Sequence, residues 1–232
     1  MKYLLPSLLV FLAAASPRLL QAQAGPRELT GACNGGDATA CLQLARLYAQ
    51  GLDVSTDGRR AEQLSLIACD GGVPEGCTQL GRWLLQGLYL GTDEPRAVGL
   101  FRRACEAGDG GGCDEASLAY ERGTGVIENV GTAISYGQKA CEQQWRNACL
   151  RLGDRFERGI DVAKNEARAA ELYTTGCALA EANSCVRLAK MYEDGRGVPR
   201  DLDKALGYYR RGCDVGNSLA CQVAALRSRG IM

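Results

Sequence analysis

The sequence predicts an all-α protein in which one helix-turn-helix unit is repeated along the chain as a solenoid. The first observation is the spacing of twelve cysteines, which form two series that each have a period of 36 residues and are offset by eight. A glycine and an aspartate or asparagine recur with the same period. An uninterrupted repeat of one supersecondary unit is typical of solenoids rather than of globular enzymes. The first series is Cys33, Cys69, Cys105, Cys141, Cys177 and Cys213, and the second is Cys41, Cys77, Cys113, Cys149, Cys185 and Cys221.

Residues 1–24 have the features of a secretory signal peptide. Lys2 supplies a positive charge, an apolar run covers residues 4–15, and residues 22–24 (Ala-Gln-Ala) form a small-x-small cleavage site. A cut after Ala15 is the alternative. The apolar run is shorter than the ~20 residues that span a bilayer, so we expect no integral membrane span after cleavage. The expected mature chain, 25–232, is a single solenoid domain.

The cysteine content favours export, because disulfides persist outside the reducing cytosol and an even number of thiols permits complete pairing. We therefore expect a secreted or periplasmic protein, with buried reduced thiols as the alternative. The chain has 27 basic and 27 acidic residues, and removal of 1–24 takes away only Lys2 and Arg18, which leaves 25 basic and 27 acidic residues. This balance argues against nucleic acid as a partner, because nucleic-acid binding requires a basic surplus.

The first helix of each block has one apolar stripe and ends at a glycine. In the fifth block the stripe is Cys185, Leu188, Ala189 and Tyr192. The glycine that follows can adopt the left-handed conformation that ends a helix. One column of the stripe is aromatic, and we assign it to the buried core. The glycines are Gly51, Gly87, Gly123, Gly159 and Gly195, and the aromatic column is Tyr48, Tyr120, Phe156 and Tyr192.

The second helix of each block begins at a short polar side chain six residues after the glycine. An aspartate or asparagine there can accept hydrogen bonds from the first amides of a helix. We therefore divide the chain into blocks 33–68, 69–104, 105–140, 141–176 and 177–212 and a partial block 213–232, with a truncated helix over 26–32; such half-repeats act as caps. The capping residues are Asp57, Asp93, Asn129, Asn165 and Asp201.

The offset of eight residues indicates how the cysteines pair. One cysteine would lie at the end of a second helix and its partner about one turn into the next first helix. The two would then face each other across a tight turn, within the ~4.4–6.8 Å between Cα atoms that a disulfide needs. We predict six such disulfides, from Cys33–Cys41 to Cys213–Cys221. The alternative series, which starts with Cys41–Cys69, would leave Cys33 and Cys221 unpaired.

The clearest family pattern is Leu-x-x-Met-Tyr-x-x-Gly-x-Gly-Val from Leu188 to Val198, followed by Asp-x-x-Lys-Ala from Asp201. It resembles the Sel1-like repeat, a relative of the tetratricopeptide repeat, and the paired cysteines resemble the Helicobacter cysteine-rich protein branch of that family. The resemblance covers residues 33–229. It implies a right-handed α/α superhelical solenoid whose first helices line a concave groove. It also implies the penicillin-binding or β-lactamase activity that is assigned to this branch.

Two blocks depart from the pattern. The third has Gly110-Gly111-Gly112 at the start of its first helix and Gly137 in its second, so we expect this helix pair to be the loosest. The fourth has Gln143-Gln144 where other blocks have a glycine turn. Both departures affect local geometry and leave the architecture intact.

The sequence excludes several kinds of catalytic site. The chain has no histidine, which rules out a zinc lactamase with imidazole ligands and a Ser-His-Asp triad. The Ser-x-x-Lys and Lys-Thr-Gly strings of serine lactamases are absent, as is a phosphate-binding Gly-x-x-x-x-Gly-Lys loop. All cysteines have a place in a predicted disulfide. We therefore predict no catalytic residue, cofactor or metal.

The remaining candidate site is the side of each first helix that lies opposite the apolar stripe. Polar side chains recur there at helical spacing, and amides can pair with an extended peptide while arginine can bind a carboxylate. We expect a monomeric scaffold that binds a protein or peptide in its groove, and the alternative is a penicillin-binding protein with weak β-lactamase activity. A solvated surface without a ligand explains the same pattern. The candidate binding residues are Gln43, Arg46, Gln79, Arg82, Asn147, Arg151, Asp154, Asn183, Arg187 and Lys190.

Overall fold

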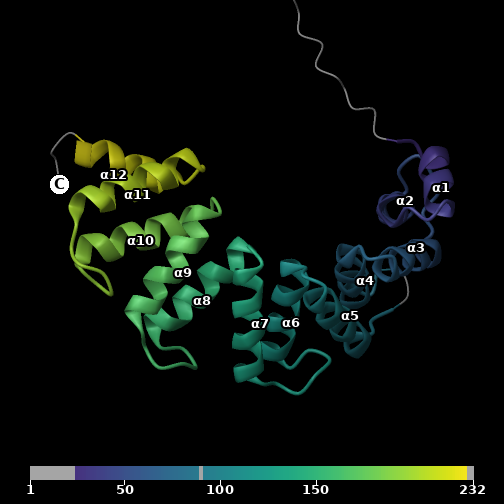
Figure 1. The fold of residues 1–232 in the computed structure, drawn as a ribbon, viewed down its shortest axis with the longest axis horizontal. Helices are drawn as coiled ribbons and strands as arrows, with labels where there is room; N and C mark the ends of the chain where they lie inside the picture. The colour runs from purple at the N-terminus through teal and green to yellow at the C-terminus, as the bar shows by residue number, and fades with distance from the viewer. Residues whose placement is uncertain (1–23, 89–90, 229–232) are drawn as a thin grey trace, which may run out of the picture.

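The computed structural model describes residues 24–88 and 91–228, and within these ranges it contains twelve α-helices and no strand. Successive helices follow an arc, with α1 and α12 at its two ends (Figure 1). The predicted signal peptide lies outside the described residues, apart from Ala24. The first helices are α2 (Ala38–Gln50), α4 (Pro74–Gln86), α6 (Gly110–Arg122), α8 (Arg146–Arg158), α10 (Ala182–Asp194) and α12 (Ser218–Ser228). The second helices are α3 (Gly58–Asp70), α5 (Glu94–Glu106), α7 (Val130–Glu142), α9 (Glu166–Ala178) and α11 (Leu202–Asp214), and the truncated α1 is Pro26–Asn34.

The predicted solenoid is confirmed, and the predicted capping residues account for the helix ends. The five C-cap glycines are all left-handed, with φ between 63° and 73°. At the start of each second helix the aspartate or asparagine side chain accepts a hydrogen bond from the backbone N–H three residues later, as Asn165 does from Arg168 at 2.9 Å. These two caps set the length of the turn between the helices of one repeat.

Six disulfides join the cysteines that are eight residues apart. Their Cα atoms are 4.4 to 4.9 Å apart, and ten of the twelve cysteines are buried. Each disulfide ties the last turn of a second helix to the first turn of the next first helix. The covalent links therefore run between consecutive helix pairs rather than between the two helices of one pair.

Pairs of a large and a small side chain fill the space between the two helices of a repeat. The rings of Phe101 and Tyr173 are fully buried, and each lies against a glycine of the preceding first helix. A Cβ atom added to Gly81 would lie 2.5 Å from Cε1 of Phe101, and one added to Gly153 would lie 2.6 Å from Cε1 of Tyr173. The glycines therefore make room for the rings. Burial of each ring stabilises the repeat by about 1.5–3 kcal/mol.

The aromatic column that was assigned to the core is only half-buried, so that assignment is wrong in degree. Tyr120 stacks on Tyr136 of the second helix, with ring centroids 5.6 Å apart. Tyr192 stacks on Tyr208 in the same way, at 5.5 Å. Tyr120 and Tyr192 lie in the last turn of their first helices, beside the turn that leads to the second helix. The central positions belong instead to the rings that project from the second helices.

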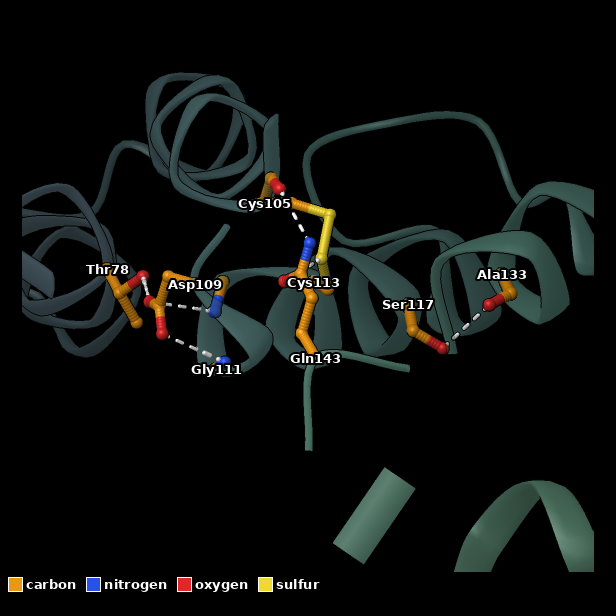
Figure 2. Close-up of a disulfide and its surroundings, with 9 residues drawn as sticks. Thr78, Cys105, Asp109, Gly111, Cys113, Ser117, Ala133 and Gln143 are labelled. Carbon is orange, nitrogen blue, oxygen red and sulfur yellow. Dashed lines mark hydrogen bonds between the residues drawn. A yellow bond between two sulfur atoms is a disulfide. The ribbon is translucent and has the colours of Figure 1, made fainter. Parts of the chain in front are cut away.

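The glycines of the third repeat lie in close contacts between helices. Gly110, Gly111 and Gly112 are all buried, and a Cβ added to Gly112 would lie 2.5 Å from Cβ of Ala104. Next to them, Asp109 accepts hydrogen bonds from the backbone N–H groups of Gly111 and Gly112 and from the hydroxyl of Thr78, as Figure 2 shows in part. Gly112 therefore permits close packing against α4 and α5, and Gly110 leaves room for Gln143 and Trp145 of the following turn. We expected the third helix pair to be the loosest, and these contacts argue against that expectation.

Gln143 and Gln144, which replace the glycine turn of the fourth block, have separate roles. Gln143 donates a hydrogen bond from Nε2 to the carbonyl oxygen of Cys105 in the preceding repeat, at 3.2 Å (Figure 2). Gln144 takes the left-handed position that Gly36, Gly72, Gly108 and Gly216 take elsewhere, with φ of 63°. Ala180 takes it in the next turn, with φ of 60°. A side chain at such a position costs roughly 1–2 kcal/mol relative to glycine.

Candidate functional site

The polar side of α2, α4, α6, α8 and α10, opposite their apolar stripes, is called the first-helix face below, and it carries the ten predicted binding residues. Five of them are exposed and five are half-buried. The half-buried ones concentrate between neighbouring first helices, where they meet side chains of the next repeat. The exposed residues are Gln43, Arg46, Asn147, Asn183 and Lys190, and the half-buried ones are Gln79, Arg82, Arg151, Asp154 and Arg187.

Ion pairs connect the first helices of consecutive repeats into one surface. Arg82 of α4 contacts Glu115 of α6 at 2.6 Å. Arg151 of α8 donates two hydrogen bonds to Asp114 of α6, at 3.1 and 2.5 Å. Because these guanidinium groups already have carboxylate partners, they hold the helices in register. They are not the free donors that the sequence led us to expect.

A second group of charges lies between α8 and α10. Arg187 contacts Asp154 at 3.4 Å, and the Tyr173 hydroxyl lies 2.6 Å from Asp154 and 2.7 Å from Glu157. A phenol has one hydrogen to donate, so the two carboxylates share it. Burial and the two carboxylates raise the pKa of Tyr173 well above its ordinary value. The phenol therefore stays neutral, and its hydroxyl holds both carboxylates in place through hydrogen bonds.

The carboxylate of Glu157 is further held by Arg196, at 2.7 Å. Burial raises the pKa of Glu157, but the hydrogen bonds from Tyr173 and Arg196 outweigh burial and leave that pKa below its ordinary value. Tyr209 repeats this arrangement one repeat later, where it donates to Glu193 at 2.9 Å. Arg227 of α12 pairs with the same carboxylate. Glu157 and Glu193 are therefore both bound to partners within the protein.

A hollow of about 360 Å³ lies between α8 and α10. Leu150 and Val186 supply apolar surface in it, and Lys190 is exposed and has no ion-pair or hydrogen-bond partner among the described residues. Asn183 is less free, because its amide group donates to Glu181 at 3.3 Å and accepts from Asn217 at 3.1 Å. Four predicted binding residues line the hollow, namely Asp154, Asn183, Arg187 and Lys190.

The other predicted amides are not gathered into the hollow. Gln43, Gln79 and Asn147 lie on separate helices, and none has a hydrogen-bond partner within the described part of the chain. Gln43 and Gln79 occupy the same position of consecutive repeats. They therefore offer unused donors and acceptors along the face, one repeat apart.

Two further hollows lie away from this face. One, of about 410 Å³, lies between α7 and α9, with Leu172 and Leu179 among its lining residues. The other, of about 490 Å³, lies beside α1 and includes Tyr48. It forms where α1 has 9 residues and the other second helices have 13. Neither hollow contains a predicted binding residue.

Within residues 24–88 and 91–228, no group of three or more histidine, cysteine, aspartate or glutamate side chains could hold a metal ion. All twelve cysteines are in disulfides. None of the described helices is both long and apolar enough to cross a membrane.

Sequence reasoning missed the acids that neutralise this face. Asp114 and Glu115 were not among the candidates. Glu115 is 33 residues from Arg82 in the sequence, and Asp114 is 37 residues from Arg151, so each pair is separated by about one period. A search for opposite charges separated by about one period would have found them. Tyr173 was not among the candidates either, and nothing in the sequence indicates that its hydroxyl would reach Asp154.

Comparison with known proteins identifies the repeat. The Sel1 repeat family model matches residues 38–73, 74–109, 115–145, 146–180 and 182–217. Its frame begins at the first helix rather than at the cysteine, and its third match begins after the triple glycine. A comparison with curated protein sequences finds no match.

Solved structures of repeat proteins are similar to this one. A Sel1 repeat protein from Oxalobacter formigenes superposes with a TM-score of 0.68 at 24% identity, covering 87% of this chain and 81% of that chain. The protective antigen c5321 of uropathogenic Escherichia coli, which displays an SLR fold, gives 0.69 at 24% identity over 90% of this chain, which spans only 53% of that chain. Helicobacter pylori cysteine-rich protein B gives 0.45 at 29% identity, covering 55% of this chain and 92% of that chain.

The fold of the first two structures agrees with the helix pairs described above. The five matched segments cover most of the described residues, and the protein is a repeat scaffold of a kind that typically mediates protein interactions. The chain belongs to the Sel1 repeat family.

Proposed function

We propose that this protein is an exported scaffold that binds a peptide or a segment of a protein partner without catalysing a reaction. The ligand would lie along the first-helix face, which would form the concave groove of the solenoid. The observation that carries the proposal is the hollow between α8 and α10, which is lined by Asp154, Asn183, Arg187 and Lys190. It combines apolar surface with a cation that has no internal partner, and such a mixture is typical of binding sites.

The free amides support an extended ligand. Gln43, Gln79 and Asn147 have donors and acceptors that no described residue uses, and a peptide in extended conformation presents the matching groups of its own backbone. The rigid arc favours binding, because a surface that is already ordered loses little conformational entropy when the ligand arrives. Six disulfides keep it ordered.

Export is proposed from the signal-like residues 1–24 and from the disulfides, which are consistent with an oxidising compartment outside the cytoplasm. A monomer is proposed because polar side chains are exposed at both ends of the solenoid, although Leu219 and Leu226 of α12 are exposed as well. Arg27, Glu28 and Asn34 are exposed on α1. At the other end Gln222 is exposed at the position that the buried Val186 occupies in the preceding first helix.

Selection from a displayed library of random peptides tests the proposal. The bait is the oxidised protein, and the matched variants are Lys190→Glu in the hollow and Arg210→Glu on α11, where the side chain is also exposed and has no partner among the described residues. We expect enriched peptides whose binding is weakened by Lys190→Glu and unchanged by Arg210→Glu. Enrichment that ignores the hollow, or no enrichment at all, would refute binding at this site.

A further inference from the structure

On the first-helix face, more basic than acidic side chains lack an ion-pair partner within the protein. Most of its acids have partners within the protein: Glu115 pairs with Arg82 and Asp114 with Arg151. Asp154 pairs with Arg187 at 3.4 Å. At the C-terminal end of α10, Asp194 contacts Arg196 at 3.2 Å. Each pair removes one negative and one positive charge from those that an approaching ligand would meet.

Four cations remain on the same face without a carboxylate partner among the described residues. Arg46, Arg122, Arg158 and Lys190 are all exposed, and no described acid lies within ion-pair distance of any of them. One exposed acid on this face, Glu75, is also unpaired. The unpaired charge of the face is therefore clearly positive, whereas residues 25–232 together contain slightly more acids than bases.

The four cations share one side of the solenoid because of the 36-residue period. Arg46 and Lys190 occupy the same position of their repeats, four periods apart, and Arg122 and Arg158 occupy the position four residues later in theirs. Residues four apart lie on the same side of a helix. The cations therefore form a row that extends from α2 to α10, with the hollow at its C-terminal end.

We propose that the ligand of this face is an acidic peptide segment in extended conformation, anchored by a carboxylate that binds Lys190 in the hollow between Leu150 and Val186. This inference rests on the proposed function and specifies the chemical class of its partner. Packed helices lie about 10 Å apart, and an extended chain covers that distance in about three residues. In the polyproline II form of an extended chain, which has three residues per turn, acidic side chains at roughly every third position lie on one side and would meet successive repeats.

Charge complementarity sets the expected behaviour. Exposed charges that attract a ligand act mainly on the rate of association, and their effect falls as salt screens them over about 10 Å at 0.1 M. Apolar contact with Leu150 and Val186 would persist in salt. We therefore expect binding that weakens with ionic strength but does not vanish.

The probes are two synthetic twelve-residue peptides with blocked ends, one with the repeat Ser-Ser-Glu and the other with Ser-Ser-Gln. Fluorescence anisotropy measures their affinity for the oxidised protein at about 20 mM and about 500 mM salt. We expect the glutamate peptide to bind at least about tenfold more tightly at low salt, and this gap to close at high salt. Lys190→Glu should weaken the glutamate peptide about five- to tenfold, and Arg210→Glu less than about twofold.

Equal affinity for the two peptides, or no binding of either, overturns the acidic assignment. A single-stranded oligonucleotide of twelve nucleotides is the anionic control, and binding as tight as that of the glutamate peptide also overturns it. The selection from the peptide library distinguishes failure of the acidic-ligand assignment from failure of the proposed function. Neutral selected peptides whose binding depends on Lys190 would leave the proposed function standing, whereas the absence of any such peptide would remove both.

Discussion

Replacement of Gly153 by alanine should destabilise the fourth repeat even though it improves the helix propensity of α8. Gly153 lies inside α8, where alanine is favoured over glycine by about 1 kcal/mol. The new Cβ atom would lie 2.6 Å, 2.8 Å and 3.1 Å from Cε1, Cδ1 and Cζ of Tyr173. Ordinary contacts between carbon atoms are about 3.5–4.0 Å, so the ring or the helix must move by about 1 Å.

The ring has no easy direction in which to move. Tyr173 is fully buried, and its hydroxyl is held by Asp154 and Glu157 at 2.6 and 2.7 Å. Overpacking of this kind costs about 1–3 kcal/mol, and a strained phenol hydrogen bond adds about 1 kcal/mol. After the gain in propensity is subtracted, we expect a net loss of about 1–3 kcal/mol.

Native-state hydrogen exchange of the α8 and α9 amides measures this loss, because repeat proteins open locally. The expected loss raises exchange rates about five- to 150-fold, since 1.4 kcal/mol corresponds to a factor of ten. Gly207→Ala in α11 is the control, because nothing lies within 4 Å of the added Cβ there, and it should slow exchange. Tyr173→Leu should relieve most of the cost of Gly153→Ala. Slower exchange in Gly153→Ala, or full additivity in the double variant, would contradict the packing argument.

Further expectations concern turns, pH, disulfides and turnover. Gln144→Gly and Ala180→Gly should each raise the free energy of unfolding in urea by about 0.5–1 kcal/mol, because both residues have a positive φ; no gain would show that the turns are unstrained. Burial and two carboxylates raise the pKa of Tyr173, so its contribution to stability is complete below the unfolded pKa of about 10 and declines as pH rises above it. Tyr173→Phe should lower stability by about 1–3 kcal/mol at neutral pH and reduce that alkaline decline, and an unchanged pH profile would count against the network. Joint replacement of Cys141 and Cys149 by serine should cost about 2.5 kcal/mol in urea unfolding, because it opens a loop with a separation of eight residues; a cost near zero would mean that packing alone holds this turn. A chromogenic β-lactam should not be hydrolysed by the oxidised protein, whereas turnover that survives repurification and is lost in Lys190→Glu would revive the hydrolase alternative.

The sequence predicted the helices and caps well because each depends on residues close together in the chain. Asn165 caps α9 through the amide three residues away, and the turn after Gly159 ends α8 within one residue of the expected place. The cysteine pairs are also local, with a separation of eight residues. Such features follow from helix geometry alone, and a constant period repeats the inference five times.

The functional face was predicted less completely because its chemistry depends on contacts between repeats. Whether Arg151 is free depends on the rotation of α8 relative to α6, which places Asp114 within 2.5 Å of it. Local spacing carries no information about that rotation. The same is true of Tyr173, whose hydroxyl crosses from a second helix to acids of the first. Lys190 was identified as a candidate, but its lack of a partner emerges only when all neighbouring helices are in place.

The placement of the disulfides between repeats has a mechanical consequence. When the two ends of the protein are pulled apart, tension passes through each sulfur bridge and bypasses the residues between its two cysteines, such as those between Cys69 and Cys77. Those tight turns cannot be drawn out while the bridges are intact. Extension while the bridges are intact must therefore come from the parts of the chain outside them, and reduction of the bridges would lengthen the stretched chain by about 3.5 Å for each residue released. The maximum length to which the protein can be stretched therefore depends on whether its disulfides are oxidised or reduced.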